Sequence, residues 1–344
     1  MEYGYEHSDT FHDETSSYGT AGVNLPLKGA NKIVAQIFSM YPDDSDRTDA
    51  ESLAQELTEF IQNLLSRPEI SGDAGDWHNI AVDIARKDYY DLCCDLLEEG
   101  LRHFPTNTDL LGDYLQYGTS CGRIEQCKQY YKQLAKLPKI KYTWRGFHFS
   151  MSWLTYLWES SESQKEMDKL YEQMQMLVNS YREYFPYRED SYVCASNMYE
   201  LVKQQELVEN VLREAVEQKF PSPKCALRLA DIYYERGDYA EALKMVHKSL
   251  KDANRVQQAV NEEYLYYLSG LARISIHNNT EGQAEEGSTE EIYRDFEDCL
   301  RIGTRRDFRD RIRDKIAVLK RQTQVEIPAD CRKLYELLDD ADLL

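Results

Sequence analysis

The sequence has no long apolar run, no secretion signal and no recognisable catalytic motif. No stretch approaches the roughly 20 consecutive apolar residues that a membrane span requires. Residues 1–6 lack the basic and apolar regions of a signal peptide. There is no phosphate-binding glycine loop, no G-x-S-x-G elbow and no H-E-x-x-H pair. These absences predict a cytoplasmic, non-enzymatic protein that has no cofactor and does not enter a membrane.

The eight cysteines form no recognisable metal site or disulfide framework. No two of them make a C-x-x-C pair, and no histidine lies nearby at ligand spacing. Free cysteine commonly behaves as a small buried apolar residue. We therefore expect no bound metal and mostly reduced, buried thiols at Cys93, Cys94, Cys121, Cys127, Cys194, Cys225, Cys299 and Cys331.

The charge is strongly negative, with 61 Asp and Glu against 41 Lys and Arg and a net charge of −20. Such a charge repels nucleic-acid phosphates and anionic lipids at long range, so nucleic acid is a disfavoured partner for the molecule as a whole. The apolar content of 42% in 344 residues is nevertheless enough for a continuous core.

Prolines that can end helices recur along the chain. Pro105, Pro138, Pro186 and Pro221 are separated by 33, 48 and 35 residues. Two of these steps are close to the ~34-residue period of a common helical repeat. The step of 48 fits one repeat that carries an insertion of about fourteen residues.

The clearest repeat runs from Pro223 to Asn254. Between its two helices, residues 236–239 include Gly237, which can end the first helix in the left-handed conformation. Small residues at Ala230 and Ala242 let the two helices approach closely. With this pattern the segment resembles the tetratricopeptide repeat (TPR) family. The residues that carry the resemblance are Leu229, Ala230, Tyr233, Ala242 and Val246.

A second repeat, 74–107, also matches the TPR spacing through its closing proline, although Cys93 and Leu97 replace the usual alanine and aromatic residue. The resemblance is good over 74–256 and less regular beyond. It implies an all-α fold, a right-handed α-solenoid of stacked helix-turn-helix hairpins over 74–321.

Other segments interrupt or flank these repeats. We expect an insertion near 142–165 and a loop at 278–288. Residues 28–73 should form a helical region that caps the first repeat, because terminal repeats need a polar outer side. The acidic and aromatic residues 1–27 predict a disordered tail, and 322–344 a capping or docking helix.

The TPR resemblance implies a binding groove that is lined by the first helix of each hairpin. Residues of the two clear repeats that lie on a first helix and do not face the core are the candidate partner-binding residues. They are His78, Val82, Arg86, Lys224, Leu227, Asp231, Tyr234 and Glu235. They could equally be ordinary solvated helix positions.

Seven aromatic residues fall within the seventeen residues from Tyr142 to Trp158. Trp and Tyr are enriched at binding hot spots, but an aromatic stripe at helical spacing also suits a core. Both interpretations stay open for the candidate interface residues Trp144, Phe147, Trp153 and Trp158, of which Trp144 and Trp158 are expected to be the most exposed.

The segment 305–321 is basic but contains interleaved acids, which suits a solvated helix with ion pairs. Binding of an anion such as RNA is the alternative. Its candidate residues are Arg305, Arg306, Arg309 and Arg313.

Taken together, the sequence predicts a non-catalytic scaffold or adaptor that binds a partner protein or peptide, as one subunit of a larger complex. Self-association could accompany this role. The alternatives are a peptide-responsive regulator of a separate effector and an RNA-binding accessory protein that uses 305–321.

Overall fold

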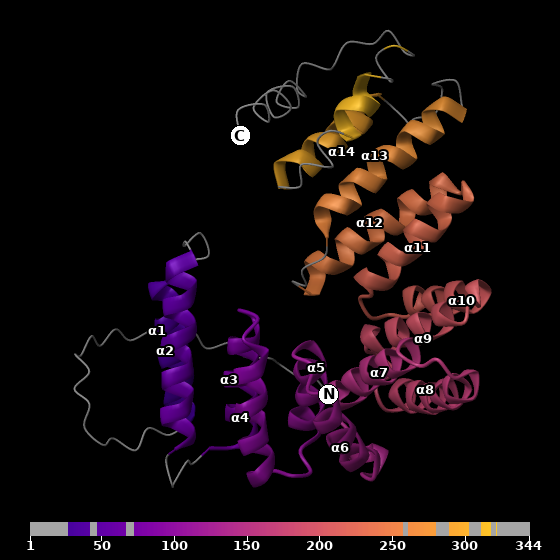
Figure 1. The fold of residues 1–344 in the computed structure, drawn as a ribbon. Helices are drawn as coiled ribbons and strands as arrows, with labels where there is room; N and C mark the ends of the chain where they lie inside the picture. Colours follow the sequence, from indigo (N-terminus) through magenta and orange to yellow (C-terminus); the bar gives the residue numbers. More distant parts are fainter. Residues whose placement is uncertain are drawn as a thin grey trace. The chain divides into compact units, whose positions relative to one another are not determined.

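The computed structural model describes residues 27–41, 47–66, 72–256, 261–279, 289–302, 311–317 and 321. Over these residues all regular secondary structure is helical (Figure 1). The tail was predicted over 1–27, but Leu27 is buried and begins the first helix, so that boundary was wrong by one residue. Residues 1–26, the predicted terminal helix at 322–344 and most of the loop at 278–288 lie outside the described residues. The chain divides into two compact units, Met1–Leu110 (unit 1) and Leu111–Leu344 (unit 2).

Unit 1 consists of two packed helical pairs. Helix α1 (Leu27–Met40) packs on α2 (Arg47–Leu65), and α3 (Ala74–Ala85) packs on α4 (Tyr90–His103). The pairs join because α1 contacts α3 and α2 contacts α4. Helices α1 and α2 therefore cover one side of the α3/α4 hairpin, in the segment that the sequence predicts to be a cap.

Small residues on α4 let it pack closely against α3. The Cys93 thiol donates to the carbonyl oxygen of Ala81 over 3.2 Å. A Cβ at Gly100 would lie only 3.0 Å from Trp77, so a glycine there allows α4 to approach the indole. Asp73 and Asp76 form a capping box that begins α3.

Unit 2 continues the chain as successive hairpins. After α5 (Thr108–Ser120), which spans the unit boundary, come α6, a short 3₁₀ helix η1, and α7 to α14. Their bounds are α6 Ile124–Ala135, η1 Lys139–Lys141, α7 Trp144–Glu159, α8 Gln164–Tyr184, α9 Glu189–Leu201, α10 Gln205–Glu217, α11 Pro223–Arg236, α12 Tyr239–Val256, α13 Glu262–Asn279 and α14 Thr289–Ile302.

Each of these hairpins from α7 onward packs on the next one (Figure 1). Contacts join the two helices of each hairpin, and each second helix also contacts the following first helix, as α8 does with α9 and α10 with α11. The predicted all-α architecture of stacked helical hairpins is confirmed. The 48-residue step between prolines holds η1 and α8, which at 21 residues is the longest described helix.

The turn between α11 and α12 has the geometry that the sequence predicts. Gly237 has φ 89° and ψ 8°, in the left-handed region. Its N–H donates to the carbonyl of Tyr234, and the N–H of Asp238 donates to that of Tyr233 over 2.8 Å. These bonds satisfy the carbonyls left open at the end of α11.

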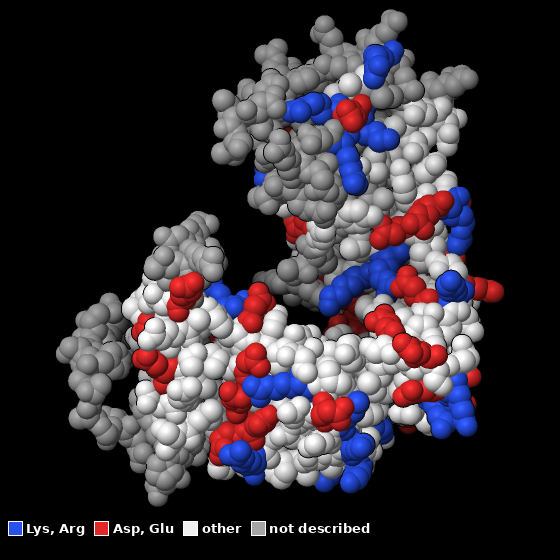
Figure 2. Space-filling model, viewed as in Figure 1, with Lys and Arg blue, Asp and Glu red and all other residues white. Residues whose placement is uncertain are grey.

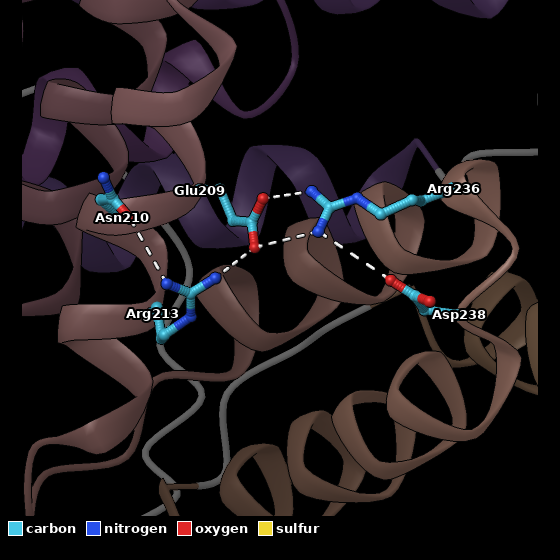
Figure 3. A network of polar contacts seen from close by, with 5 residues as sticks. All are labelled: Glu209, Asn210, Arg213, Arg236 and Asp238. Carbon is cyan, nitrogen blue, oxygen red and sulfur yellow. Dashed lines mark hydrogen bonds and ion pairs between the residues drawn. The ribbon is translucent and has the colours of Figure 1, made fainter.

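An ion-pair network ties α10 to this turn (Figure 3). The carboxylate of Glu209 on α10 accepts hydrogen bonds from the guanidinium groups of Arg213 and Arg236. Arg236 also lies 3.9 Å from Asp238, and Arg213 donates to Asn210 over 3.3 Å. Hydrogen bonding by Arg236 lowers the pKa of Glu209, so the carboxylate stays charged and cross-links two successive hairpins.

Candidate functional site

The first helices of the unit 2 hairpins are neighbours in space. Helix α7 contacts α9, α9 contacts α11, and α11 contacts α13. We call the surface formed by these four helices the first-helix face. Local signals position it: the Thr143 hydroxyl accepts from the N–H of Gly146 to begin α7, and Pro223 occupies the first turn of α11.

At the α7–α9 junction, an arginine covers a tryptophan. The guanidinium of Arg188 lies 3.6 Å from the ring centroid of Trp144, and Arg188 Nε lies 3.1 Å from Asp190 Oδ2. Below them, His148 Nδ1 lies 3.5 Å from Cys194 Sγ. These contacts join the N-terminal halves of α7 and α9.

At the α9–α11 junction, two cations of α11 reach side chains of α9. Lys224 Nζ lies 3.2 Å from Asp190 Oδ1. Arg228 donates to Asn197 Oδ1 and to Glu200 Oε2, each over 2.5 Å. Beside these contacts is a surface depression lined by Thr155, Glu159, Asn197, Glu200 and Leu201.

At the α11–α13 junction, the hydroxyl of Tyr264 donates to Asp231 Oδ1 over 2.6 Å. Burial raises the pKa of Asp231, which the hydrogen bond from Tyr264 partly offsets. Leu227 and Tyr234 pack against the cluster that contains Val246 and Leu265. This junction is therefore more apolar than the α9–α11 junction.

Burial and neighbouring cations together decide which groups at the α7–α9 junction are charged. Burial lowers the pKa of His148 and raises that of the Cys194 thiol, so at neutral pH the pair is an uncharged imidazole and a thiol. A thiol in this state is a poor nucleophile. Burial alone would raise the pKa of Asp190, but Lys224 and Arg188 hold it below its ordinary value, so Asp190 is a carboxylate.

A buried carboxyl group joins α9 to α11 beneath this face. Glu189 is 7% exposed, and it accepts a hydrogen bond from the backbone N–H of Cys225 over 2.8 Å. That N–H is in the first turn of α11, where Ser222 makes no side-chain cap. Burial raises the pKa of Glu189 to about 7.

The predicted groove residues have different surroundings. On α11, Lys224 and Glu235 are exposed, whereas Asp231, Leu227 and Tyr234 are half-buried in the contacts given above. On α3 in unit 1, Arg86 is exposed, Val82 half-buried and His78 buried at 7% exposure.

The aromatic segment divides between core and surface. Phe147 and Trp153 are fully buried, and Phe147 stacks on Tyr181 with ring centroids 5.1 Å apart. Trp144 and Trp158 are half-buried and keep some accessible surface. Of the four candidate interface residues, these two can reach a partner without a change in the core.

The basic segment is only partly described. Residues 311–317 are helical and include the half-buried Arg313. The candidates Arg305, Arg306 and Arg309 lie outside the described residues.

Hairpins that stack in chain order, first helix against first helix, are the arrangement of TPR solenoids. The fold is therefore a TPR-like stack of helical hairpins. No family model matches the chain, and no curated protein does.

Solved TPR proteins are similar in fold, at low identity. One from Thermus thermophilus has 19% identity and a TM-score of 0.43, over 54% of this chain and 96% of that one. One from Parabacteroides merdae has 13% identity and a TM-score of 0.44, over 82% and 97%. The C-terminal part of one from Cytophaga hutchinsonii has 12% identity and a TM-score of 0.48, over 77% and 95%.

Several residues of the first-helix face were missed in the sequence. They lie on α9 or directly before it, on α11, or at the start of α13, and they are Arg188, Asp190, Asn197, Glu200, Arg228 and Tyr264. Arg228 follows Lys224 by one helical turn, so its place on the same side of α11 could have been predicted. The α9 residues could not, because their repeat keeps few TPR signature positions.

No group of three or more metal-ligating side chains occurs among the described residues. No helix in them is both long enough and apolar enough to span a bilayer.

Proposed function

We propose that this TPR-like protein is a non-catalytic scaffold or adaptor that binds a partner protein or peptide on its first-helix face, in the cytoplasm and as a subunit of a complex. One observation supports this most directly. Polar side chains along the face are fixed by bonds between successive helices, through the pairs Asp190–Lys224, Glu200–Arg228 and Asp231–Tyr264.

Side chains that are already held in place lose little conformational freedom when a partner binds. The fixed carboxylates, amide and guanidinium groups offer both donors and acceptors to a peptide backbone. Trp144, held under Arg188, offers an aromatic surface beside them. The depression at Asn197 and Glu200 gives room for a side chain of the partner.

Two of the earlier alternatives remain as hypotheses. A peptide-responsive regulator would use the same face, and would differ in releasing an effector when a short peptide binds. An RNA-binding role would depend on 305–321.

The test is affinity purification from the native cell with nuclease treatment, comparing the wild type with Arg228→Ala and with Arg294→Ala. Arg294 is an exposed arginine on α14 that pairs with Glu290 one turn earlier on the same helix, so it is a matched control. We expect a stoichiometric protein partner to be retained by the wild type and by Arg294→Ala and to be reduced at least fivefold with Arg228→Ala. Equal recovery with all three proteins would contradict a role for this face.

A further inference from the structure

The most unusual charge distribution of the chain begins on α6 and η1, before the first-helix face, and continues through α7. Residues 126–158 contain no Asp or Glu, although the average of the chain would place about six there. The same stretch contains six Lys and Arg residues, at Lys128, Lys132, Lys136, Lys139, Lys141 and Arg145. The chain has a net charge of −20, but the charged side chains of this segment are all positive at neutral pH.

The structure places most of these bases together, at the end of α6, on η1 and at the start of α7. Lys132, Lys136 and Lys141 are exposed. No ion pair to Lys132 or Lys136 occurs within the described part of the chain. On the face drawn in Figure 2, Lys and Arg side chains gather over α6, whereas acids and bases alternate over much of the remaining described surface.

Large apolar side chains are exposed beside these lysines. Ile140, between Lys139 and Lys141, is 75% exposed, and Tyr187 and Tyr184 are 78% and 43% exposed. Contacts at the start of α7 place the two tyrosines near these bases. Phe147 lies 4.9 Å from Tyr142 and 6.2 Å from Tyr184, measured between centroids, and Tyr187 directly precedes Arg188, which covers Trp144. We call Lys132, Lys136, Ile140, Lys141, Tyr184 and Tyr187 the basic–aromatic patch.

A fourth amine lies at the edge of this patch. Lys139 Nζ donates to the hydroxyl of Tyr142 over 2.7 Å and lies 3.9 Å from the centre of its ring. The Tyr142 hydroxyl in turn donates to the carbonyl of Leu134. Burial lowers the pKa of Lys139 to about 8, so a nearby carboxylate would favour its charged form.

We propose that the basic–aromatic patch binds an acidic peptide segment of a partner protein, in which aliphatic or aromatic residues alternate with Asp or Glu. The lysines would pair with the carboxylates, and Ile140 and the two tyrosines would cover the apolar residues. Aromatic and aliphatic anchors beside charges of one sign are typical of such interfaces.

A peptide fits this surface better than a nucleic acid does. At physiological salt, charges are screened over about 8 Å, so a short acidic segment would meet mainly the local lysines. A longer polyanion would extend over the acidic remainder of the molecule and be repelled. The exposed aliphatic side chain of Ile140 also has no counterpart on a phosphate backbone.

This proposal does not depend on the first-helix face, because different residues carry it. Arg228→Ala should leave binding at the patch unchanged, and the patch variants should leave binding at the first-helix face unchanged. Failure of either proposal can therefore be recognised separately.

The experiment measures fluorescence anisotropy of two labelled synthetic 14-residue peptides against the full chain. In the first, Glu and Asp alternate with Leu and Phe; in the second, Ser replaces Leu and Phe. The patch variant carries Lys132→Glu, Lys136→Glu and Lys141→Glu. The control variant carries Lys169→Glu, Lys219→Glu and Lys251→Glu, three exposed lysines of unit 2 that give the same net charge.

We expect the first peptide to bind the patch variant at least tenfold more weakly than the control variant, with an affinity that falls as salt is raised. Ile140→Ser should weaken the first peptide about threefold and leave the second peptide unchanged. Equal binding by patch and control variants would overturn the proposal. Tighter binding of a U12 oligonucleotide, or of phosphatidylserine vesicles, than of the first peptide would overturn it in favour of those partners.

Discussion

The buried carboxyl of Glu189 should make the stability of unit 2 depend on pH in an unusual direction. Burial raises its pKa from the ordinary 4.5 to about 7, although the N–H of Cys225 and the amine of Lys224 act to lower it. The folded chain therefore binds this proton more tightly than the unfolded chain does. The stabilisation is complete below pH 4.5, and it is lost as the pH rises through 7.

The size of the effect follows from the two pKa values. They differ by about 2.5, and each tenfold change in proton affinity is worth about 1.4 kcal/mol, which gives a ceiling of about 3 kcal/mol. Glu189→Gln should remove this loss, because the amide keeps an acceptor for the N–H of Cys225 and carries no charge. We expect the variant to exceed the wild type by under about 1 kcal/mol at pH 5 and by about 1–3 kcal/mol at pH 8.

The assay is urea unfolding at pH 5, 6, 7 and 8, followed by tryptophan fluorescence. Trp144, Trp153 and Trp158 lie in unit 2, and Trp77→Phe removes the signal of unit 1. Glu206→Gln is the control, because Glu206 is an exposed acid in the first turn of α10. Parallel pH profiles for the wild type and Glu189→Gln, or a variant that is less stable at pH 8, would refute the reasoning.

Two further predictions concern residues with contrasting surroundings. Gly237→Ala should destabilise unit 2 by about 1 kcal/mol through backbone strain alone, because φ is 89° and nothing lies within 4 Å of an added Cβ; an unchanged urea midpoint would contradict this. Trp153→Ala should cost about 3–5 kcal/mol, because its side chain is fully buried, whereas Trp144→Ala should cost under about 1.5 kcal/mol and instead weaken partner binding. Equal losses of stability in these two variants, measured by thermal unfolding, would show that both residues belong to the core.

The repeated hairpins could be predicted because their signals are local. Helix-ending prolines, the Gly237 turn and the small residues Ala230 and Ala242 each act within one repeat of about 34 residues. The helical region that the sequence predicts over 28–73 likewise depends on short-range amphipathic patterns. Periodicity therefore determined the fold class.

Tertiary structure alone decided which side chains meet across the repeats. Asp190 and Lys224 are 34 residues apart, and Glu200 and Arg228 are 28 apart, so their pairing depends on how one hairpin packs on the next. The same holds for His148 and Cys194, which are 46 residues apart and which no sequence motif connects.

The aromatic segment shows most clearly what the sequence alone leaves open. The sequence favoured Trp144 as one of the two more exposed candidates but left core and interface open for all four. Phe147 and Trp153 are buried, whereas Trp144 lies at the surface under Arg188. All three share one helix, and only the packing of α8 and α9 against α7 decides which face of that helix is covered. The sequence by itself thus determined that this chain stacks helical hairpins, and the packing between hairpins decided which surfaces are left to bind a partner.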